Sequence, residues 1–299
     1  MISTSPWDAF PRRPKVDVCQ WKGNIVRIAV LVLTVAVGLV SCSDRGKEEG
    51  QAMKDDSIRK DLELIASKKV FFGHQSVGAN ILAGLKDLNS QTEEPRLNFV
   101  SITDSSFPKG PYFADAPVGK NAEPNTKCDA FVRLVGQMAK DSLDVALLKF
   151  CFVDIREGTN VEEVFSYYQQ AITGLKSASP GVTIVHVTVP LIQREPAWKL
   201  LARKILGRKD VQPLRLAKMN AYNEKLRQTY AGEPIFDLAT IESTFPDGRR
   251  SAFEYEGRKV YSLIGAYTDD GGHLDATGRR IAAKELVRVL ANALRHRGQ

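Results

Sequence analysis

Two short segments near opposite ends of the chain carry residues that could act together in acyl transfer. Residues 70–78 (VFFGHQSVG) form an apolar run that breaks at a glycine and delivers Ser76. Residues 270–273 (DGGH) place Asp270 and His273 three positions apart. A serine on a strand-to-helix turn and a histidine with its own carboxylate are the groups that acyl transfer requires. Ser76 could instead cap the helix that follows, and His273 could be an ordinary loop histidine, but the pairing favours nucleophile, general base and orienting carboxylate.

Apolar runs that alternate with helical patterns indicate the elements that position these residues. We expect five strands, at Val70–Phe72, Asn98–Ile102, Val145–Phe152, Thr183–Val189 and Ile235–Leu238. We expect helices at Val77–Leu88, Asp129–Ala139, Val161–Ala178, Pro213–Tyr230 and Gly278–Leu294. Strands that are apolar throughout and alternate with helices are typical of a parallel sheet covered on both faces. The expected fold is therefore α/β, a three-layer α/β/α sandwich with a mainly parallel five-stranded sheet.

The element order also predicts that the two segments meet. Ligands of such sheets lie beyond the carboxyl ends of the strands, and Ser76 directly follows the first strand. The last helix must begin at the same edge if it packs on the sheet, so the loop carrying His273 lies there too. One domain over residues 55–299 accounts for the pattern, preceded by a tether at 42–54.

With this layout, the chain resembles the SGNH/GDSL hydrolase superfamily, which has a flavodoxin-like three-layer fold. That family carries an early serine after the first strand and a late Asp-x-x-His before the final helix. The resemblance implies Ser76 as nucleophile, His273 as base and Asp270, rather than Asp269, as its carboxylate. It implies an ester hydrolase without metal or cofactor, acting on a small-molecule or polysaccharide ester such as an O-acylated carbohydrate.

The chain departs from the family pattern at two places. Gly73-His74-Gln75-Ser76 replaces Gly-Asp-Ser, and Cys151-Phe152-Val153-Asp154 stands where Gly-x-Asn-Asp is expected, so the oxyanion asparagine is missing there. Gly119 and Asn121, in the long loop after the second strand, could supply a backbone N–H and a replacement amide. Gly110 is a rival for the glycine.

Several polar residues near these segments have two interpretations each. His74, Gln75, Lys149 and Asp154 could line a pocket, although a structural role for His74 is favoured. Lys149 interrupts an apolar strand, so it needs a buried partner, for which Asp154 and Asp237 are candidates. His186 reads as a core histidine and His296 as a solvated one. A metal-dependent hydrolase using His74, Asp270 and His273 ranks last, because no metal-ligand motif is present.

The N-terminus predicts export and a lipid anchor. Residues 28–40 are uncharged and follow a basic stretch, as in the apolar region of a signal peptide spanning residues 1–41. Leu39-Val40-Ser41-Cys42 resembles the bacterial lipobox, which makes Cys42 the lipidated residue. We expect a protein of the bacterial cell envelope, held at the outer membrane if the source is Gram-negative. A plain signal anchor is the alternative.

Two cysteines remain in the expected domain. Counting residues along the helix and the strand places Cys128 and Cys151 at the same edge of the sheet, so a disulfide could join them in an oxidising compartment. Two reduced thiols are the alternative, and slightly the more favoured one.

Charge argues against nucleic acid as a partner. Without the first 41 residues, 37 basic residues oppose 33 acidic ones, and no nucleic-acid motif is present. Residues 190–211 hold six basic and two acidic residues, with Trp198, Leu201, Ala202 and Ile205 on one helical face. This insertion could cover the pocket or touch anionic lipid or polysaccharide, but a surface helix whose apolar side packs on the domain is favoured. A non-catalytic module that binds glycan or a partner protein is the main alternative to an esterase.

Overall fold

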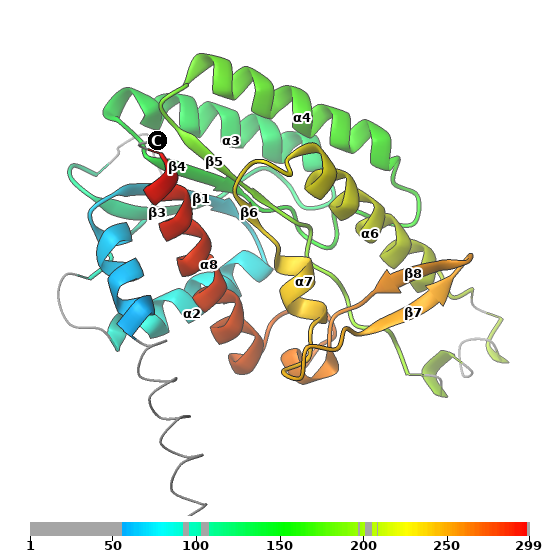
Figure 1. Cartoon of the computed structure of the whole chain (residues 1–299). Coiled ribbons are helices and arrows are strands. Elements are labelled where there is room, and N and C mark those ends of the chain that lie inside the picture. Colours follow the sequence, from blue (N-terminus) through cyan, green and yellow to red (C-terminus); the bar gives the residue numbers. More distant parts are fainter. Residues whose placement is uncertain are drawn as a thin grey trace, which may run out of the picture. The chain divides into compact units, whose positions relative to one another are not determined.

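Short apolar segments form a six-stranded parallel sheet at the centre of the fold (Figure 1). The computed structural model describes residues 56–91, 96–102, 108–196, 198–200, 205–207 and 209–297. The strands, in the spatial order β2-β3-β1-β4-β5-β6, are β2 Phe99–Ser101, β3 Tyr112–Pro117, β1 Lys69–His74, β4 Val145–Leu148, β5 Thr183–Val187 and β6 Ile235–Phe236. All five neighbouring pairs are parallel. The predicted α/β class is confirmed, with six strands in the central sheet rather than five.

Strand β3 is the strand of the central sheet that the sequence prediction missed. Its sequence, YFADAP, contains Asp115 and Pro117, two residue types that are depleted in strands. In the fold, β3 lies between β2 and β1, and Asp115 is 8% exposed. Pro117 ends the strand, where its missing N–H costs no ladder bond. The loop that carries Gly119 therefore follows a central strand directly beside β1.

Helices cover both faces of the sheet, which explains why the strands are apolar throughout. Figure 1 shows α2 and α8 on one face and α3 and α4 on the other, and the contacts pair them in the same way. The helices are α2 Val77–Ser90, α3 Pro124–Met138, α4 Val161–Ala178, α6 Gln212–Thr229, α7 Leu238–Ser243 and α8 Ala276–His296. Residues 56–66 form a further helix, which precedes β1.

Helix α8 shows how the predicted pattern becomes packing. Its buried side includes Ala282, Leu286 and Leu290, which recur at helical spacing and face α2 and the sheet. Asp275 caps its first turn by accepting from the N–H groups of Thr277 and Gly278. This cap fixes where α8 begins, and hence where the preceding loop with Asp270 and His273 is held.

Two surface features differ from expectation. A hairpin of β7 Ala252–Tyr255 and β8 Arg258–Tyr261, which was not predicted, turns at Glu256 and Gly257, both with positive φ. The preference for a packed apolar side in the 190–211 insertion is wrong for its described residues, since Trp198 is 68% and Ile205 77% exposed. No described helix is long and apolar enough to cross a membrane. The predicted signal segment, tether and Cys42 lie outside the described residues.

Candidate active site

The backbone bends sharply at Ser76, between β1 and α2. Ser76 has φ 53° and ψ −115°, a conformation that a residue with a Cβ rarely adopts. Such strain persists only where the surroundings impose it, and it is typical of a serine presented on a strand-to-helix turn. Ser76 makes no side-chain capping bond to α2, so the alternative role as a helix cap is wrong. Its hydroxyl is instead directed to another partner.

Gly78 allows this turn to close. A Cβ built on Gly78 would lie 2.4 Å from Cβ and 2.5 Å from Cγ of His74, far inside contact distance. The first turn of α2 therefore rests directly on the end of β1, with the His74 side chain beneath it. A side chain at position 78 would push the turn that carries Ser76 away from the strand.

Hydrogen bonds join Ser76 to His273 and His273 to Asp270. Ser76 Oγ lies 2.7 Å from His273 Nε2, and His273 Nδ1 lies 2.7 Å from Asp270 Oδ2. The carboxylate takes the N–H of Nδ1, which leaves Nε2 to accept the proton of Ser76. The structure thus brings together, in the expected order, the three residues that the sequence pairs across almost two hundred positions.

Asp270 is held as a carboxylate by its own loop. The Asp270 pKa lies well below its usual range because it accepts hydrogen bonds from the backbone N–H of His273, from the His273 ring and from the Gly272 N–H. Gly271, with φ 84°, supplies the left-handed residue that this turn needs. Asp270 Oδ1 takes the two backbone bonds, so Oδ2 remains for the imidazole.

Contacts from two other elements fix this loop in place. Asn80 of α2 accepts from the Leu274 N–H at 3.3 Å, which ties the loop to the same helix that begins after Ser76. Gly271 O accepts from the Gln193 N–H at 2.8 Å, after the end of β5. The relative position of Ser76 and His273 is therefore set by α2 and by the loop after β5.

Phe152 packs against the imidazole. Its ring centre lies 5.5 Å from that of His273 in an edge-on arrangement, and a Cβ on Gly272 would approach its ring at 3.0 Å. Arg215 of α6 donates from Nη2 to Phe152 O at 2.8 Å. Phe152 thus holds the His273 ring from the β4 side.

Gly119 lies beside the turn that carries Ser76, as its place after β3 requires. Gln75 donates from Nε2 to Val118 O at 2.9 Å and to Gly119 O at 2.6 Å. Gly119 has φ 58°, and a Cβ there would lie 2.5 Å from the backbone N of Lys127. Gln75 is therefore a clamp between the two turns rather than a free pocket residue. Gly110 precedes β3 and so lies at the opposite edge of the sheet. The alternative in which Gly110 replaces Gly119 as the backbone donor is therefore wrong.

Asp154 organises the loop that holds Asn121. Its Oδ2 lies 2.6 Å from Lys127 Nζ and 2.6 Å from the Cys151 N–H, and its Oδ1 accepts from the Ala122 N–H at 2.8 Å. Lys127 also donates to Asn121 Oδ1 at 3.0 Å, so the Asn121 amide hydrogens remain as donors on an exposed side chain. No described hydrogen bond joins Asn121 to the triad.

The partner expected for Lys149 is wrong. Lys127 takes Asp154, and Asp237 binds Arg227 at 2.8 Å. Lys149 is fully buried and donates from Nζ to Gln75 O at 2.7 Å. Desolvation lowers its pKa. The sequence identified Lys149 as unusual but could not give its partner, because that depends on which turn closes over the end of β4.

His74 has a structural position. It is 6% exposed, lies beneath Gly78 and packs against Phe72 with ring centres 4.6 Å apart and the rings tilted by 38°. Its Nε2 is 3.4 Å from Asp115 Oδ2, and no described hydrogen bond links it to Asp270 or His273. No group of three or more metal-binding side chains occurs within the described ranges.

The disulfide considered between Cys128 and Cys151 does not form. Both cysteines are free and buried. Cys128 lies in the second turn of α3, which begins at Pro124, earlier than predicted. Cys151 Sγ instead lies 3.5 Å from both Lys149 Nζ and Gln75 O.

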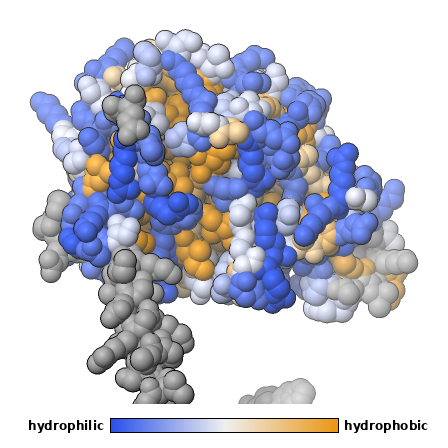
Figure 2. All heavy atoms as spheres, in the orientation of Figure 1, coloured by the Kyte–Doolittle hydropathy of each residue, from blue (hydrophilic) through white to orange (hydrophobic). Residues whose placement is uncertain are grey.

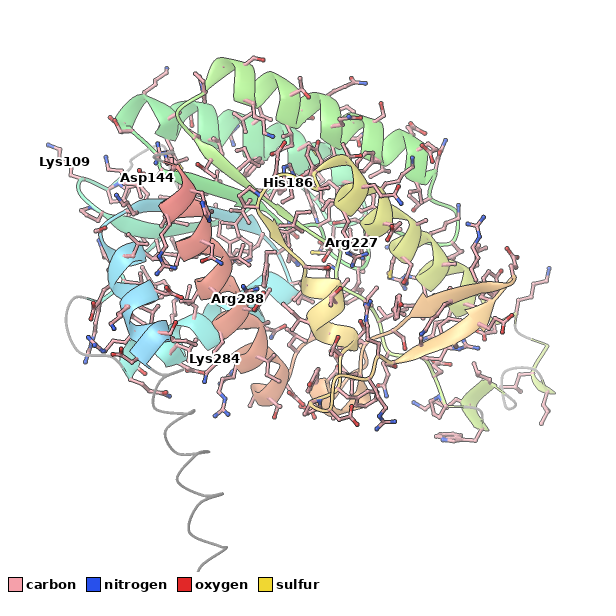
Figure 3. The ribbon with its side chains drawn as sticks, viewed as in Figure 1. Lys109, Asp144, His186, Arg227, Lys284 and Arg288 are labelled. Atoms are coloured by element: carbon pink, nitrogen blue, oxygen red, sulfur yellow. The ribbon has the colours of Figure 1, made fainter. Side chains whose placement is uncertain are left out.

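A large apolar pocket lies elsewhere on the molecule. Its volume is about 640 Å³, and its walls come from the helix at 56–66, α7, the residues just after α7, and α8, including Ile58, Ile241, Phe245 and Ile281. Figure 2 shows apolar surface between polar side chains on the face that Figure 1 presents, and Figure 3 shows Lys284 and Arg288, which also line the pocket, extending from α8. No triad residue lines it.

Sequence reasoning missed two residues of this site, Phe152 and Asn80. Phe152 belongs to the segment Cys151–Asp154 after β4, but neither its residue type nor its spacing indicates contact with His273. Asn80 lies one helical turn beyond Ser76 on α2, a spacing that could have suggested it. Both act through packing or orientation, for which residue type is a weak guide.

Comparison with known proteins gives structural likeness but no sequence match. No family model and no curated protein matches the chain. A lipase/acylhydrolase from Enterococcus faecalis has a TM-score of 0.44 at 12% identity, covering 75% of this chain and 96% of its own. An acetyl xylan esterase has a TM-score of 0.41 at 16% identity, covering 73% and 97%. A carbohydrate esterase family 3 protein from Talaromyces cellulolyticus has a TM-score of 0.43 at 13% identity, covering 77% and 99%. Other matches are described as a putative SGNH hydrolase from Slackia heliotrinireducens and a putative lipolytic protein of the G-D-S-L family from Desulfitobacterium hafniense.

Proposed function

We propose that this protein is a serine ester hydrolase that uses Ser76, His273 and Asp270. The observation that carries the proposal is the continuous hydrogen-bonded chain from Ser76 Oγ through the imidazole to the Asp270 carboxylate. Further support is the strained turn that presents Ser76, since backbone strain costs folding free energy and is concentrated at functional sites.

The reaction proceeds in two steps. Ser76 Oγ attacks the ester carbonyl carbon as His273 Nε2 takes the hydroxyl proton, and the carbonyl electron pair moves onto oxygen. Collapse of this intermediate breaks the bond to the alcohol, which leaves with the proton from Nε2. Water then repeats the sequence on the acyl-enzyme and releases the carboxylic acid. Asp270 accepts from Nδ1 and stabilises the imidazolium that forms in each step.

The oxyanion is assigned in this proposal to the backbone N–H groups of Ser76 and Gly119. The Gln75 clamp supports the assignment, because it ties the Gly119 turn to the residue before the nucleophile. Asn121 is a third donor in the proposal, with its amide oxygen already occupied by Lys127. Losing one such donor costs about 10²–10³ in rate in other enzymes.

Labelling with a fluorophosphonate probe tests the nucleophile. The full chain in detergent is incubated with the probe beside two variants, Ser76→Ala and Ser90→Ala. Ser90 is a matched control because it lies on α2, is exposed and bonds only Asp87 O among the described residues. We expect labelling of the parent and of Ser90→Ala and none of Ser76→Ala. A folded parent that takes no label would instead favour the glycan- or partner-binding module.

The substrate and the location extend the proposal. We propose an O-acylated carbohydrate as the first substrate class to screen, since the superfamily resemblance implies it. We also propose attachment to the bacterial envelope through Cys42, supported by the lipobox-like segment that ends there. Replacing Cys42 by alanine should move the protein from the membrane fraction to the soluble fraction and abolish incorporation of labelled palmitate. Unchanged fractionation would contradict the anchor.

A further inference from the structure

We propose that Lys149 is a positioning residue of this site, which fixes and polarises the peptide group between Gln75 and Ser76. The proposal rests on the proposed function and extends it to a residue that takes no part in the proton transfers. It assigns to Lys149 part of the electrostatic role that the resemblance gives to an asparagine missing from this chain.

The first observation is that Lys149 is buried without an ion-pair partner. Its side chain is fully buried, and no described carboxylate lies within 4.0 Å of Nζ. Its nearest acceptor is Gln75 O at 2.7 Å, with Cys151 Sγ at 3.5 Å. Burying an amine that has only a carbonyl and a thiol as partners is costly. A purely structural lysine would be expected to have a carboxylate, as Lys127 has in Asp154.

The second observation is where the accepting carbonyl belongs. Gln75 O accepts from Lys149 Nζ and, at 3.1 Å, from the Gly78 N–H. A peptide group is planar and trans, so holding its carbonyl on one side directs its N–H to the other. That N–H is the one of Ser76, which the proposed function assigns to the oxyanion. No described acceptor takes it.

Two physical effects follow from this arrangement. Because the φ of Ser76 is strained, the observed orientation of the Gln75–Ser76 peptide is unfavourable by itself. The hydrogen bond from Lys149 Nζ stabilises that orientation. Donation to the carbonyl also polarises the peptide, which makes its N–H a stronger donor. The Gln75 side chain extends this effect, because its bond to Val118 O at 2.9 Å fixes the peptide that carries the Gly119 N–H, the second proposed donor. Lys149 therefore supports both proposed backbone donors through one residue.

This role accounts for the departure in the segment after β4. Val153 stands where the resemblance expects the oxyanion asparagine, and Lys149 lies on the same segment, directly after β4. The Lys149 side chain is thus buried beneath the turn and binds the carbonyl of the Gln75–Ser76 peptide. Its effect is on the Ser76 N–H, which lies on the opposite side of that peptide.

The test compares Lys149→Met, which removes the donor, with Lys149→Gln, which keeps a neutral donor. Hydrolysis of p-nitrophenyl acetate by the full chain gives kcat and KM, normalised to the fraction titrated by a fluorophosphonate. Inhibition by phenylboronic acid, whose serine adduct places an oxygen in the oxyanion position, gives the affinity for a tetrahedral mimic. His186→Gln is the control, because His186 is equally buried, lies on β5 and contacts no triad residue.

We expect Lys149→Met to lower kcat about 10- to 100-fold, to leave KM within about twofold and to weaken boronate binding by a similar factor as kcat. The kcat and the boronate affinity of Lys149→Gln should lie between those of the parent and of Lys149→Met. Lys149→Gln alone tests the proposal if Lys149→Met does not fold. His186→Gln should keep kcat per titrated site. A merely structural lysine would change only the titrated fraction.

Two results would overturn the proposal and are distinguishable. If both Lys149 variants keep kcat within about twofold per titrated site while Ser76→Ala is inactive, the positioning role is wrong and the esterase stands. If the parent shows no turnover that depends on Ser76, the proposed function fails and the role of Lys149 fails with it.

Discussion

At the scale of single residues, Asp270 shows how local hydrogen bonds keep a carboxylate ionised. Its carboxylate accepts from two backbone N–H groups and from the imidazole, which together keep its pKa far below the usual range. Asp270 therefore stays ionised as the pH falls through the range in which other aspartates take up protons. Its own protonation should not contribute to any loss of activity on mild acidification.

Replacing Asp270 by asparagine should lower kcat by about 10³–10⁴ with little change in KM, because an amide cannot hold the imidazole in the required tautomer. Hydrolysis of p-nitrophenyl acetate measures the effect. Asp269→Asn is the matched control, since Asp269 is the exposed neighbour and has no described bond to His273. Equal losses in the two variants would argue against Asp270 as the orienting carboxylate.

At the scale of elements, the site depends on how closely α2 approaches the end of β1. Glycine at position 78 lets the helix begin directly on the His74 side chain, and this contact determines where Ser76 is presented. Glycines in the middle of exposed helices have no such role. Gly174 of α4 is a glycine of this second kind, since a Cβ built on it would meet no atom within 4 Å.

We expect Gly78→Ala to destabilise the fold by about 1–3 kcal/mol, because the added methyl overlaps His74 and displaces the turn. Fluorophosphonate labelling of the folded fraction should fall as well. Gly174→Ala should be neutral or stabilise by up to about 1 kcal/mol, since alanine is the better helix former. Urea unfolding measures both variants, and a tolerated alanine at 78 with full labelling would show that the close approach is not required.

At the scale of the whole molecule, two buried titratable groups make stability depend on pH in opposite directions. Burial lowers the pKa of His186 to about 4, although Glu233 lies 2.9 Å from its Nε2. As the pH falls below about 6.5, the unfolded chain binds this proton first, so the free energy of unfolding decreases towards acid. Figure 3 labels His186 between the sheet and the α4–α6 side of the fold.

Glu242 acts at the other end of the range. Burial raises its pKa to about 8, so the folded protein keeps a proton that the unfolded chain releases above about 4.5. The free energy of unfolding therefore decreases as the pH rises from about 4.5 to 8. Its Oε2 accepts from the Leu191 N–H at 2.7 Å, a bond that a glutamine oxygen can keep.

The two groups give a paired prediction. Glu242→Gln should raise the free energy of unfolding by about 4 kcal/mol more at pH 8 than at pH 5. His186→Gln should show the opposite trend, with a change about 2 kcal/mol more favourable at pH 5 than at pH 8. Urea unfolding at the two pH values measures both. Changes that do not depend on pH would mean that these groups titrate alike in the folded and unfolded chains.

The sequence by itself determined the features that depend on short patterns. Alternating apolar runs and helical periodicity predicted the α/β class, and α4 was predicted with its observed bounds. The strand-to-helix turn at Ser76 and the Asp-x-x-His spacing placed the three candidate residues at one edge, because element order decides which loops share an edge of a parallel sheet.

Only the tertiary structure decided the features that depend on which distant segments meet. Strand β3 contains Asp115 and Pro117, so its place between two strands follows from long-range pairing rather than from its own propensities. The partner of Lys149 is the carbonyl of Gln75, 74 positions away, and a carbonyl acceptor leaves no trace in residue type. Residue type predicts that a buried amine needs a partner, whereas the closing of the Ser76 turn over β4 determines what that partner is.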